Sequence, residues 1–111
     1  MEKIVRYRAI LAQIIWEEAQ HHLIESDIEV CQICDDEHQH YQLLYLGWQA
    51  SKWVFAPIIH LRIHNEKIWV EHDGTEEGIT NKLLAAGVPR DEIVLAFYSP
   101  QKRSYTEFAI A

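Results

Sequence analysis

Basic residues are missing from a long part of this chain, since no lysine or arginine stands between Arg8 and Lys52. Over the whole 111 residues, seventeen acidic residues face ten basic ones, and the formal net charge is −7. A protein that holds DNA through its phosphates needs a surplus of cations to displace counterions, so the composition argues against direct DNA binding. The carboxylates of the cation-free stretch form either a solvated surface or a contact face for a basic partner. They are Glu17, Glu18, Glu25, Asp27, Glu29, Asp35, Asp36 and Glu37.

Cysteines and long apolar runs are also scarce. The two cysteines, Cys31 and Cys34, are too close in sequence to close a useful loop, which fits free thiols in a reducing compartment. No apolar run reaches the roughly eighteen residues of a membrane span, and the N-terminus lacks the pattern of a secretory signal. We therefore expect a cytoplasmic protein with no membrane segment. Because 49% of the residues are hydrophobic, residues 1–111 are expected to form a single domain with its own core.

The usual sequence signals of catalysis are weak. The four glycines stand singly, which leaves no phosphate-cradling loop, and Ser26 and Ser99 lack the context of a nucleophile elbow. Asp73 with Glu76 or Glu77 would make an acid/base pair, but the same residues are typical of an ordinary helix cap. We expect no enzyme and no cofactor.

Two groups of metal-ligand residue types remain. Cys31 and Cys34, followed by His38 and His40, have the residue types of a zinc site, yet residues three apart on a strand point to opposite faces. Free thiols and surface histidines are the preferred interpretation, with structural zinc as the alternative. The other group is formed by His60, His64, Glu71, His72 and Asp73. His60 and His64 are four residues apart on one predicted strand, so we expect about 13 Å between them, too far to share an ion.

Apolar periodicity predicts a helix over residues 3–22, with one face formed by Ile4, Tyr7, Leu11, Ile14, Ile15 and Ala19. Further apolar residues widen this face and predict that the helix touches two surfaces: Val5, Ile10, Ala12 and Trp16. A second helix is predicted over residues 76–86, with Asp73 or Thr75 as its cap and Gly87 and Pro89 as its stop.

The rest of the chain reads as strands. Alternating apolar and polar residues from Asp27 predict a first strand, which ends in an acidic turn at 35–37. Further strands are predicted over 41–48, 53–64, 67–72, 93–98 and, less regularly, 106–110. Ile59, Leu61 and Ile63 should face the core, and Pro57 requires an edge position or a bulge. The chain is thus predicted to be an α+β protein in two layers: a mainly antiparallel sheet in the order α-β-β-β-β-α-β(-β), with helices on one face.

Aromatic residues exceed what one covered face can bury. The strands over 41–48 and 93–98 are apolar on both sides, and Trp48, Trp53, Phe55 and Trp69 also need cover. We therefore predict a homodimer formed at least partly through the sheet.

Two loops are candidate partner contacts. The first contains Asp73, Gly74, Thr75, Glu76 and Glu77. The second is the one locally basic loop with an aromatic residue, and its side chains suit a phosphate or an acidic partner, although it would also serve as plain connection. Its candidate residues are Ser99, Pro100, Lys102, Arg103 and Tyr105.

Blocks along almost the whole chain carry a family resemblance: Arg6-Tyr7-Arg8 with Ile10, 41–45 with Gly47-Trp48, 67–70, 73–79, Gly87-Val88-Pro89, and an ending with Phe97, Ser99-Pro100, Arg103 and 105–109. In order and spacing these blocks resemble the XisI family, the fdxN element excision controlling factors. The resemblance implies a cyanobacterial accessory protein that controls excision of a DNA element in programmed genome rearrangement. It implies a companion, XisH, usually encoded beside it, which is similar to restriction-endonuclease-like nucleases. It assigns no catalytic residues.

Two departures from the family pattern stand out. Cys31 and Cys34 are not part of it, which weakens the zinc interpretation, and Glu66 stands where the turn often has glycine. The leading hypothesis is an accessory protein that regulates or stabilises the nuclease-like companion by direct contact. The rival is a DNA-binding accessory factor for recombination, with Lys52, Arg90, Lys102 and Arg103 as a local basic patch.

Overall fold

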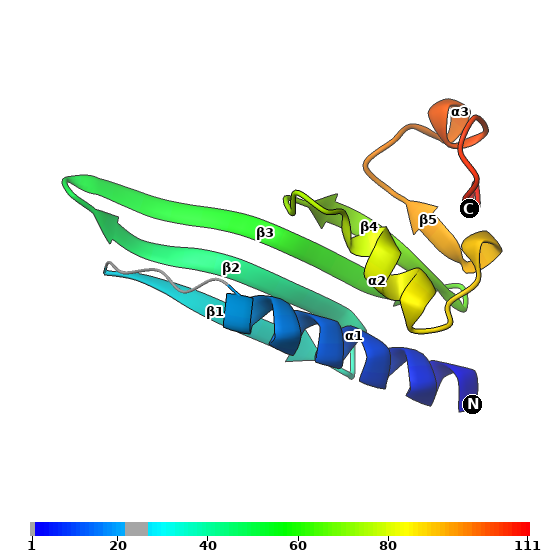
Figure 1. Cartoon of the computed structure of the whole chain (residues 1–111), viewed down its shortest axis with the longest axis horizontal. Coiled ribbons are helices and arrows are strands. Elements are labelled where there is room, and N and C mark those ends of the chain that lie inside the picture. The colour runs from blue at the N-terminus through cyan, green and yellow to red at the C-terminus, as the bar shows by residue number, and fades with distance from the viewer. Residues whose placement is uncertain (1, 22–26) are drawn as a thin grey trace.

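A five-stranded sheet forms the centre of the protein, whose computed structural model describes residues 2–21 and 27–111 (Figure 1). The strands lie in the order β1-β2-β3-β4-β5, and only the β4–β5 pair is parallel. This is the predicted α+β class with a mainly antiparallel sheet. In chain order the elements are α1 (Glu2–His21), β1 (Ile28–Asp35), β2 (His40–Gln49), β3 (Lys52–His64), β4 (Lys67–Asp73), α2 (Ile79–Ala85), the 3-10 turn η1 (Arg90–Glu92), β5 (Ile93–Leu95) and α3 (Pro100–Arg103).

The long helix α1 and the short helix α2 cover the same face of the sheet, as predicted (Figure 1). Tyr7 and Leu11 of α1 and Leu83 of α2 are fully buried in one core cluster. The sheet side of that cluster consists of Tyr41, Leu43, Ile59, Leu61, Ile63, Ile68, Val70, Ile93 and Leu95. The alternation predicted for β3 is thus confirmed. It follows from the two-residue period of a strand with one face on the core.

The predicted irregularity at Pro57 is a bulge. The β2–β3 register shifts between Leu43 and Leu44, which pair with Ile59 and Pro57, so Ile58 is the extra residue. The pairing of β3 with β4 reaches only as far as Ile59. In the described residues β3 pairs beyond the bulge with β2 alone, so Pro57 also stands in an edge segment of the sheet, where proline is tolerated.

Tight turns join the strands of the meander. Asp35 accepts hydrogen bonds from the backbone N–H and the ring of His38 at the acidic turn, where the β1–β2 hairpin forms as predicted. Asn65 and Glu66 both have positive φ, 51° and 61°, at the β3–β4 turn. Glycine adopts positive φ at little cost, which explains why the family often has glycine at the position of Glu66. Gly47 lies inside β2 at a φ of 142°, where a Cβ would come within 2.3 Å of the Asp27 carbonyl oxygen.

Several predicted element ends are wrong. Helix α2 begins at Ile79 rather than at residue 76, because side-chain bonds hold the preceding loop in a different shape. Strand β5 ends at Leu95 rather than at residue 98, because the Tyr98 N–H turns back to the Leu95 carbonyl. The strand expected over 106–110 is reduced to one bridge between Val94 and Ala109. The predicted stop of α2 is confirmed, since Gly87 has a φ of 96° and its N–H bonds to the Leu84 carbonyl.

The second apolar stripe of α1 is split between core and surface. Ile10 and Ala12 are partly buried against the core cluster, whereas Val5 and Trp16 are largely exposed. A second surface for this helix stays a prediction. His22, the last residue of the predicted helix, lies outside the described residues.

Candidate partner-binding site

The loop between β4 and α2 is held by the carboxylate of Asp73. One oxygen, Oδ1, accepts hydrogen bonds from the backbone N–H and the hydroxyl of Thr75, at 2.9 and 2.6 Å. The other, Oδ2, accepts from the N–H of Ile79 at 2.7 Å, which satisfies a free donor at the start of α2. Thr75 in turn accepts from the N–H of Gly78 at 3.1 Å. The predicted cap at Asp73 or Thr75 is therefore wrong in position, since the N-cap residue of α2 is Gly78, but the Asp73 carboxylate supplies the acceptor for the first N–H of the helix.

Two glycines allow the loop to take this shape. A Cβ at Gly74 would lie 3.1 Å from the carbonyl oxygen of Ile58, to which the Gly74 N–H already bonds at 2.7 Å. Gly78 has a φ of 85°, a backbone conformation that costs glycine little and other residues more. With both ends of the loop tied down, the side chains of Glu76 and Glu77 are left exposed.

Replacing Asp73 with alanine is expected to lower the free energy of unfolding by about 2 kcal/mol, because three donors lose their acceptor and one belongs to the buried Ile79. Urea denaturation followed by circular dichroism measures the change. Glu76→Ala, an exposed neighbour in the same loop, is the control and should stay within about 0.5 kcal/mol of wild type. Equal stability of the two variants would show that the Asp73 network contributes little.

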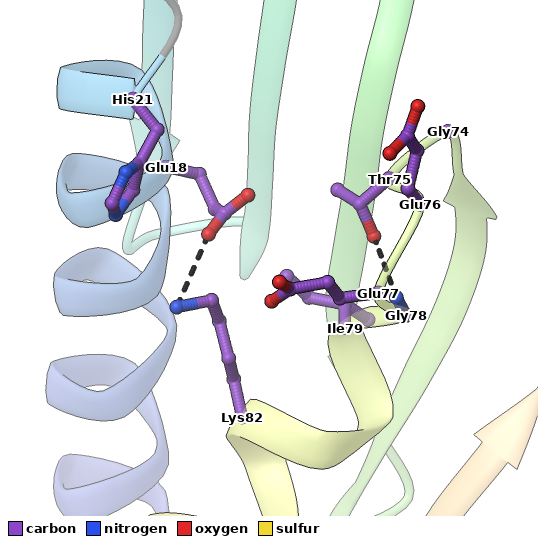
Figure 2. A pocket seen from close by; sticks show the side chains of 9 residues that line it. All are labelled: Glu18, His21, Gly74, Thr75, Glu76, Glu77, Gly78, Ile79 and Lys82. Carbon is purple, nitrogen blue, oxygen red and sulfur yellow. Dashed lines mark hydrogen bonds and ion pairs between the residues drawn. The ribbon is translucent and has the colours of Figure 1, made fainter.

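The opposite wall of the site comes from α1. Glu18 is only 7% exposed, and its carboxylate forms an ion pair with the ammonium group of Lys82 on α2, at 3.2 Å. His21 follows one turn later at the end of α1. Between this wall and the 74–78 loop lies a cleft of about 450 Å³, which Figure 2 shows with its lining side chains.

The cleft is acidic. Glu77 points across it toward Lys82 and Glu18, while Glu76 stands at its upper rim (Figure 2). Three carboxylates thus line it, against the single ammonium group of Lys82 and the imidazole of His21. Oxygen acceptors around a partly enclosed space suit the charged end of a lysine or arginine side chain. Such an arrangement can hold a cation.

The structure brings part of the first candidate loop to this cleft, since Gly74, Thr75, Glu76 and Glu77 line it while Asp73 supports them. The other wall, with Glu18, His21 and Lys82, was missed as part of a site. A signal for it exists in the sequence. Glu18 follows Leu11 by seven residues and Ile14 by four, so it is a charged residue on the buried stripe of a helix.

The second candidate loop lies elsewhere, around α3 beyond β5 (Figure 1). Ser99 caps this one-turn helix, with Pro100 at its first position. Arg103 is bound internally: its guanidinium group donates to the carbonyls of Leu95, Ala96, Tyr98 and Ile110 and lies 5.4 Å from the ring of Trp69. Tyr105, in contrast, is 84% exposed.

The four cations of the DNA-binding hypothesis do not gather in one patch. Lys52 stands at the tip of the β2–β3 hairpin, at the end of the molecule opposite α3 (Figure 1). Arg90 forms an ion pair with Glu107 at 3.1 Å, and Arg103 is occupied by backbone carbonyls. Lys102 lies 5.5 Å from the ring of Tyr98 and is exposed.

The cysteine and histidine groups are spread over both faces of the sheet. Cys31 pairs with Leu44 and Cys34 with Tyr41, which places the two thiols on opposite faces of β1. Burial raises the pKa of both thiols. Within residues 2–21 and 27–111, no group of three or more potential ligand side chains is placed to hold a metal ion.

A histidine pair lies on the open face of the sheet. Nδ1 of His40 is 2.9 Å from Nε2 of His60. Burial lowers the pKa of His60, and so, to a smaller extent, does the nearby His40. Arg62 and His72 lower it further, whereas Glu71 raises it. The ring of His60 therefore holds its proton less readily than a free imidazole.

The fold and the cleft define a class: a small α+β protein with an acidic cleft between α1 and the 74–78 loop. Across the described ranges, no helix is both long and apolar enough to cross a bilayer.

Comparisons with known proteins place the chain within that class. The XisI protein family model matches residues 1–110, so this chain belongs to the XisI family. The crystal structure of the fdxN element excision controlling factor XisI from Anabaena variabilis is 37% identical, covering 98% of this chain and 99% of that one, with a TM-score of 0.88. A XisI-like protein from the same organism is 33% identical over 97% and 99%, with a TM-score of 0.93. None of the curated proteins matches the chain.

Proposed function

We propose that this chain is a non-enzymatic accessory protein in the control of DNA element excision, and that it acts by contact with a nuclease-like companion of the XisH type. Membership of the XisI family and the 37% identity to an excision controlling factor support a role in the control of DNA element excision. The companion follows from the resemblance described above.

One observation carries the mode of action: the acidic cleft between α1 and the 74–78 loop. Nuclease-like proteins have lysine and arginine side chains where they bind phosphates, and these side chains attract carboxylates when no nucleic acid is bound. Glu76 and Glu77 are exposed, so a cationic side chain of the companion can reach them first. Glu18 is buried in the wall of the cleft beside Lys82. A lysine or arginine of the companion that entered the cleft would meet these groups in turn.

The location and assembly of the protein belong to the same proposal. We place it in the cytoplasm of a cyanobacterium, as a homodimer that binds its companion through the cleft. Direct DNA contact is the weaker alternative, since three of its four cations are paired internally or stand at the far hairpin tip.

Co-expression with the neighbouring XisH-like protein, followed by size-exclusion chromatography, tests the proposal. We expect the two proteins to elute together at micromolar concentration and to separate as salt is raised, because the contact is electrostatic. Independent elution at low salt would end the proposal. A gel shift with the element's DNA, at low salt and without the companion, tests the alternative, which predicts binding that weakens steeply with salt.

A further inference from the structure

The face of the sheet opposite the helices changes character along the β2–β3 hairpin. Near the β3–β4 turn it is polar, with His40, His60 and Arg62. Toward the hairpin tip three cross-strand pairs of β2 and β3 bring only apolar side chains to this face, while Glu29 of β1, which pairs with Leu46, is exposed beside them. These pairs are Leu44 with Pro57, Leu46 with Phe55, and Trp48 with Trp53, and together they form what we term the apolar strip.

The largest side chains of the apolar strip are open to solvent. Trp48 is 55% exposed, Trp53 53% and Phe55 64%. The two indole rings touch each other edge to face, with centroids 5.4 Å apart. Helices α1 and α2 pack against the other face, so within the described residues no helix shields the strip. Contiguous exposed aromatic residues of this size mark a contact surface.

The apolar strip lies away from β4, β5 and the C-terminal segment. Strand β3 runs seven residues, 52–58, past its last pair with β4, so the hairpin extends beyond β4 with β1 beside it, which pairs with β2 as far as Gly47 (Figure 1). A partner can therefore approach the strip without meeting α2, β5 or the C-terminal segment.

Charge decides which partner fits. Copies of a chain with a net charge of −7 repel each other over most of their surface. The six residues of the apolar strip carry no charge, so two copies can meet there with their carboxylates, including the neighbouring Glu29, at the rim of the contact. The strip itself offers no carboxylate to a basic partner. The strip is also complementary to itself, which suits a two-fold symmetric contact.

The size of the strip agrees with this assignment. Three aromatic side chains of about 150–250 Å² each, half exposed, offer roughly 300–400 Å² per copy. Two copies would then bury about 700 Å² of aromatic surface, and Leu46, Pro57 and a polar rim bring the total near the roughly 1,200 Å² of a specific interface.

We infer that the apolar strip is the contact face of a symmetric homodimer, in which Trp48, Trp53 and Phe55 pack against the same residues of a second copy. The inference rests on the homodimer proposed above and is independent of the companion. The cleft lies on the helix-covered side of the sheet, so this dimer leaves both clefts open. Each dimer therefore offers two companion sites.

The test is the mass in solution, measured by light scattering after size-exclusion chromatography. At about 50 µM we expect wild type to have twice the 13.1 kDa mass of the chain. Phe55→Glu places a charge in the middle of the strip and should raise the dimer dissociation constant at least about hundredfold, which gives the monomer mass. Trp16→Glu, an equally exposed aromatic residue on α1, should remain dimeric.

Further measurements separate dimer loss from misfolding. Circular dichroism should be unchanged in Phe55→Glu, and Trp53→Ser gives a second, uncharged disruption of the same strip. Both variants should still bind the companion, because their clefts are intact; this holds whether or not the dimer exists. A monomeric wild type, or a dimer that survives Phe55→Glu and Trp53→Ser, would overturn the inference.

Discussion

Charge reversal at the cleft, Glu76→Lys together with Glu77→Lys, is expected to weaken binding of the companion at least about hundredfold. In the wild type these carboxylates are exposed beside the buried Glu18, and the cleft attracts a cation. In the variant, two new ammonium groups stand near Lys82, and together they repel a cation of the companion. Replacing attraction by like-charge contact at such a site costs about 3 kcal/mol, which corresponds to the stated change in the dissociation constant.

Isothermal titration calorimetry at moderate salt measures this effect. A matched control reverses two exposed carboxylates away from the cleft, Glu66→Lys with Asp91→Lys, and changes the net charge by the same amount. Its binding should fall by less than about tenfold, because only long-range attraction is lost. If both double variants lost binding equally, the companion would respond to total charge and the cleft would not be its site.

Replacing Arg103 with alanine is expected to lower the free energy of unfolding by about 3 kcal/mol. Its guanidinium group donates to four backbone carbonyls and so ties the end of β5 to the C-terminal segment. It also lies 5.4 Å from the Trp69 ring, which has the guanidinium of Arg62 at 5.3 Å as a second cationic neighbour. The alanine variant leaves these carbonyls without their charged donor.

Urea denaturation of three variants tests the role of Arg103. Lys102→Ala, beside it on α3 but exposed, should change stability by less than about 0.5 kcal/mol. Arg103→Lys should recover only part of the loss, because an ammonium group does not present the planar fork of donors that reaches several carbonyls. Stability unchanged in Arg103→Ala, with DNA binding reduced, would restore the DNA-contact interpretation of this loop.

Local patterns in the sequence were sufficient for most elements. The three-and-four spacing from Ile4 to Ala19 predicted α1, and the alternation around Leu61 predicted the buried side of β3. Gly87 was interpreted correctly as the stop of α2, and Pro57 as a sign of an edge position or a bulge, because each acts on its own stretch of backbone. The cap predicted at Asp73 or Thr75 was displaced, since the N-cap is Gly78. The family also followed from the sequence, since its motifs recur in order along the whole chain.

The ends of elements were predicted less well, because they depend on distant partners. Residues 96–98 have the composition of a strand, yet Arg103 takes the carbonyls of Ala96 and Tyr98, and the Tyr98 N–H turns back to the Leu95 carbonyl. The same competition shortened the predicted strand over 106–110 to one bridge at Ala109.

The sequence alone determined the secondary-structure order, the acidic character and the face of β3 that meets the core, since these follow from neighbouring residues and from the sum of charges. Only the tertiary structure decided that Glu18 of α1 meets Lys82 of α2 beside the cleft, that the two candidate loops stand apart, and that Arg103 binds backbone carbonyls. The physical reason is that such contacts join residues far apart in the chain. Their meeting depends on how helices pack on the sheet, which local periodicity does not specify.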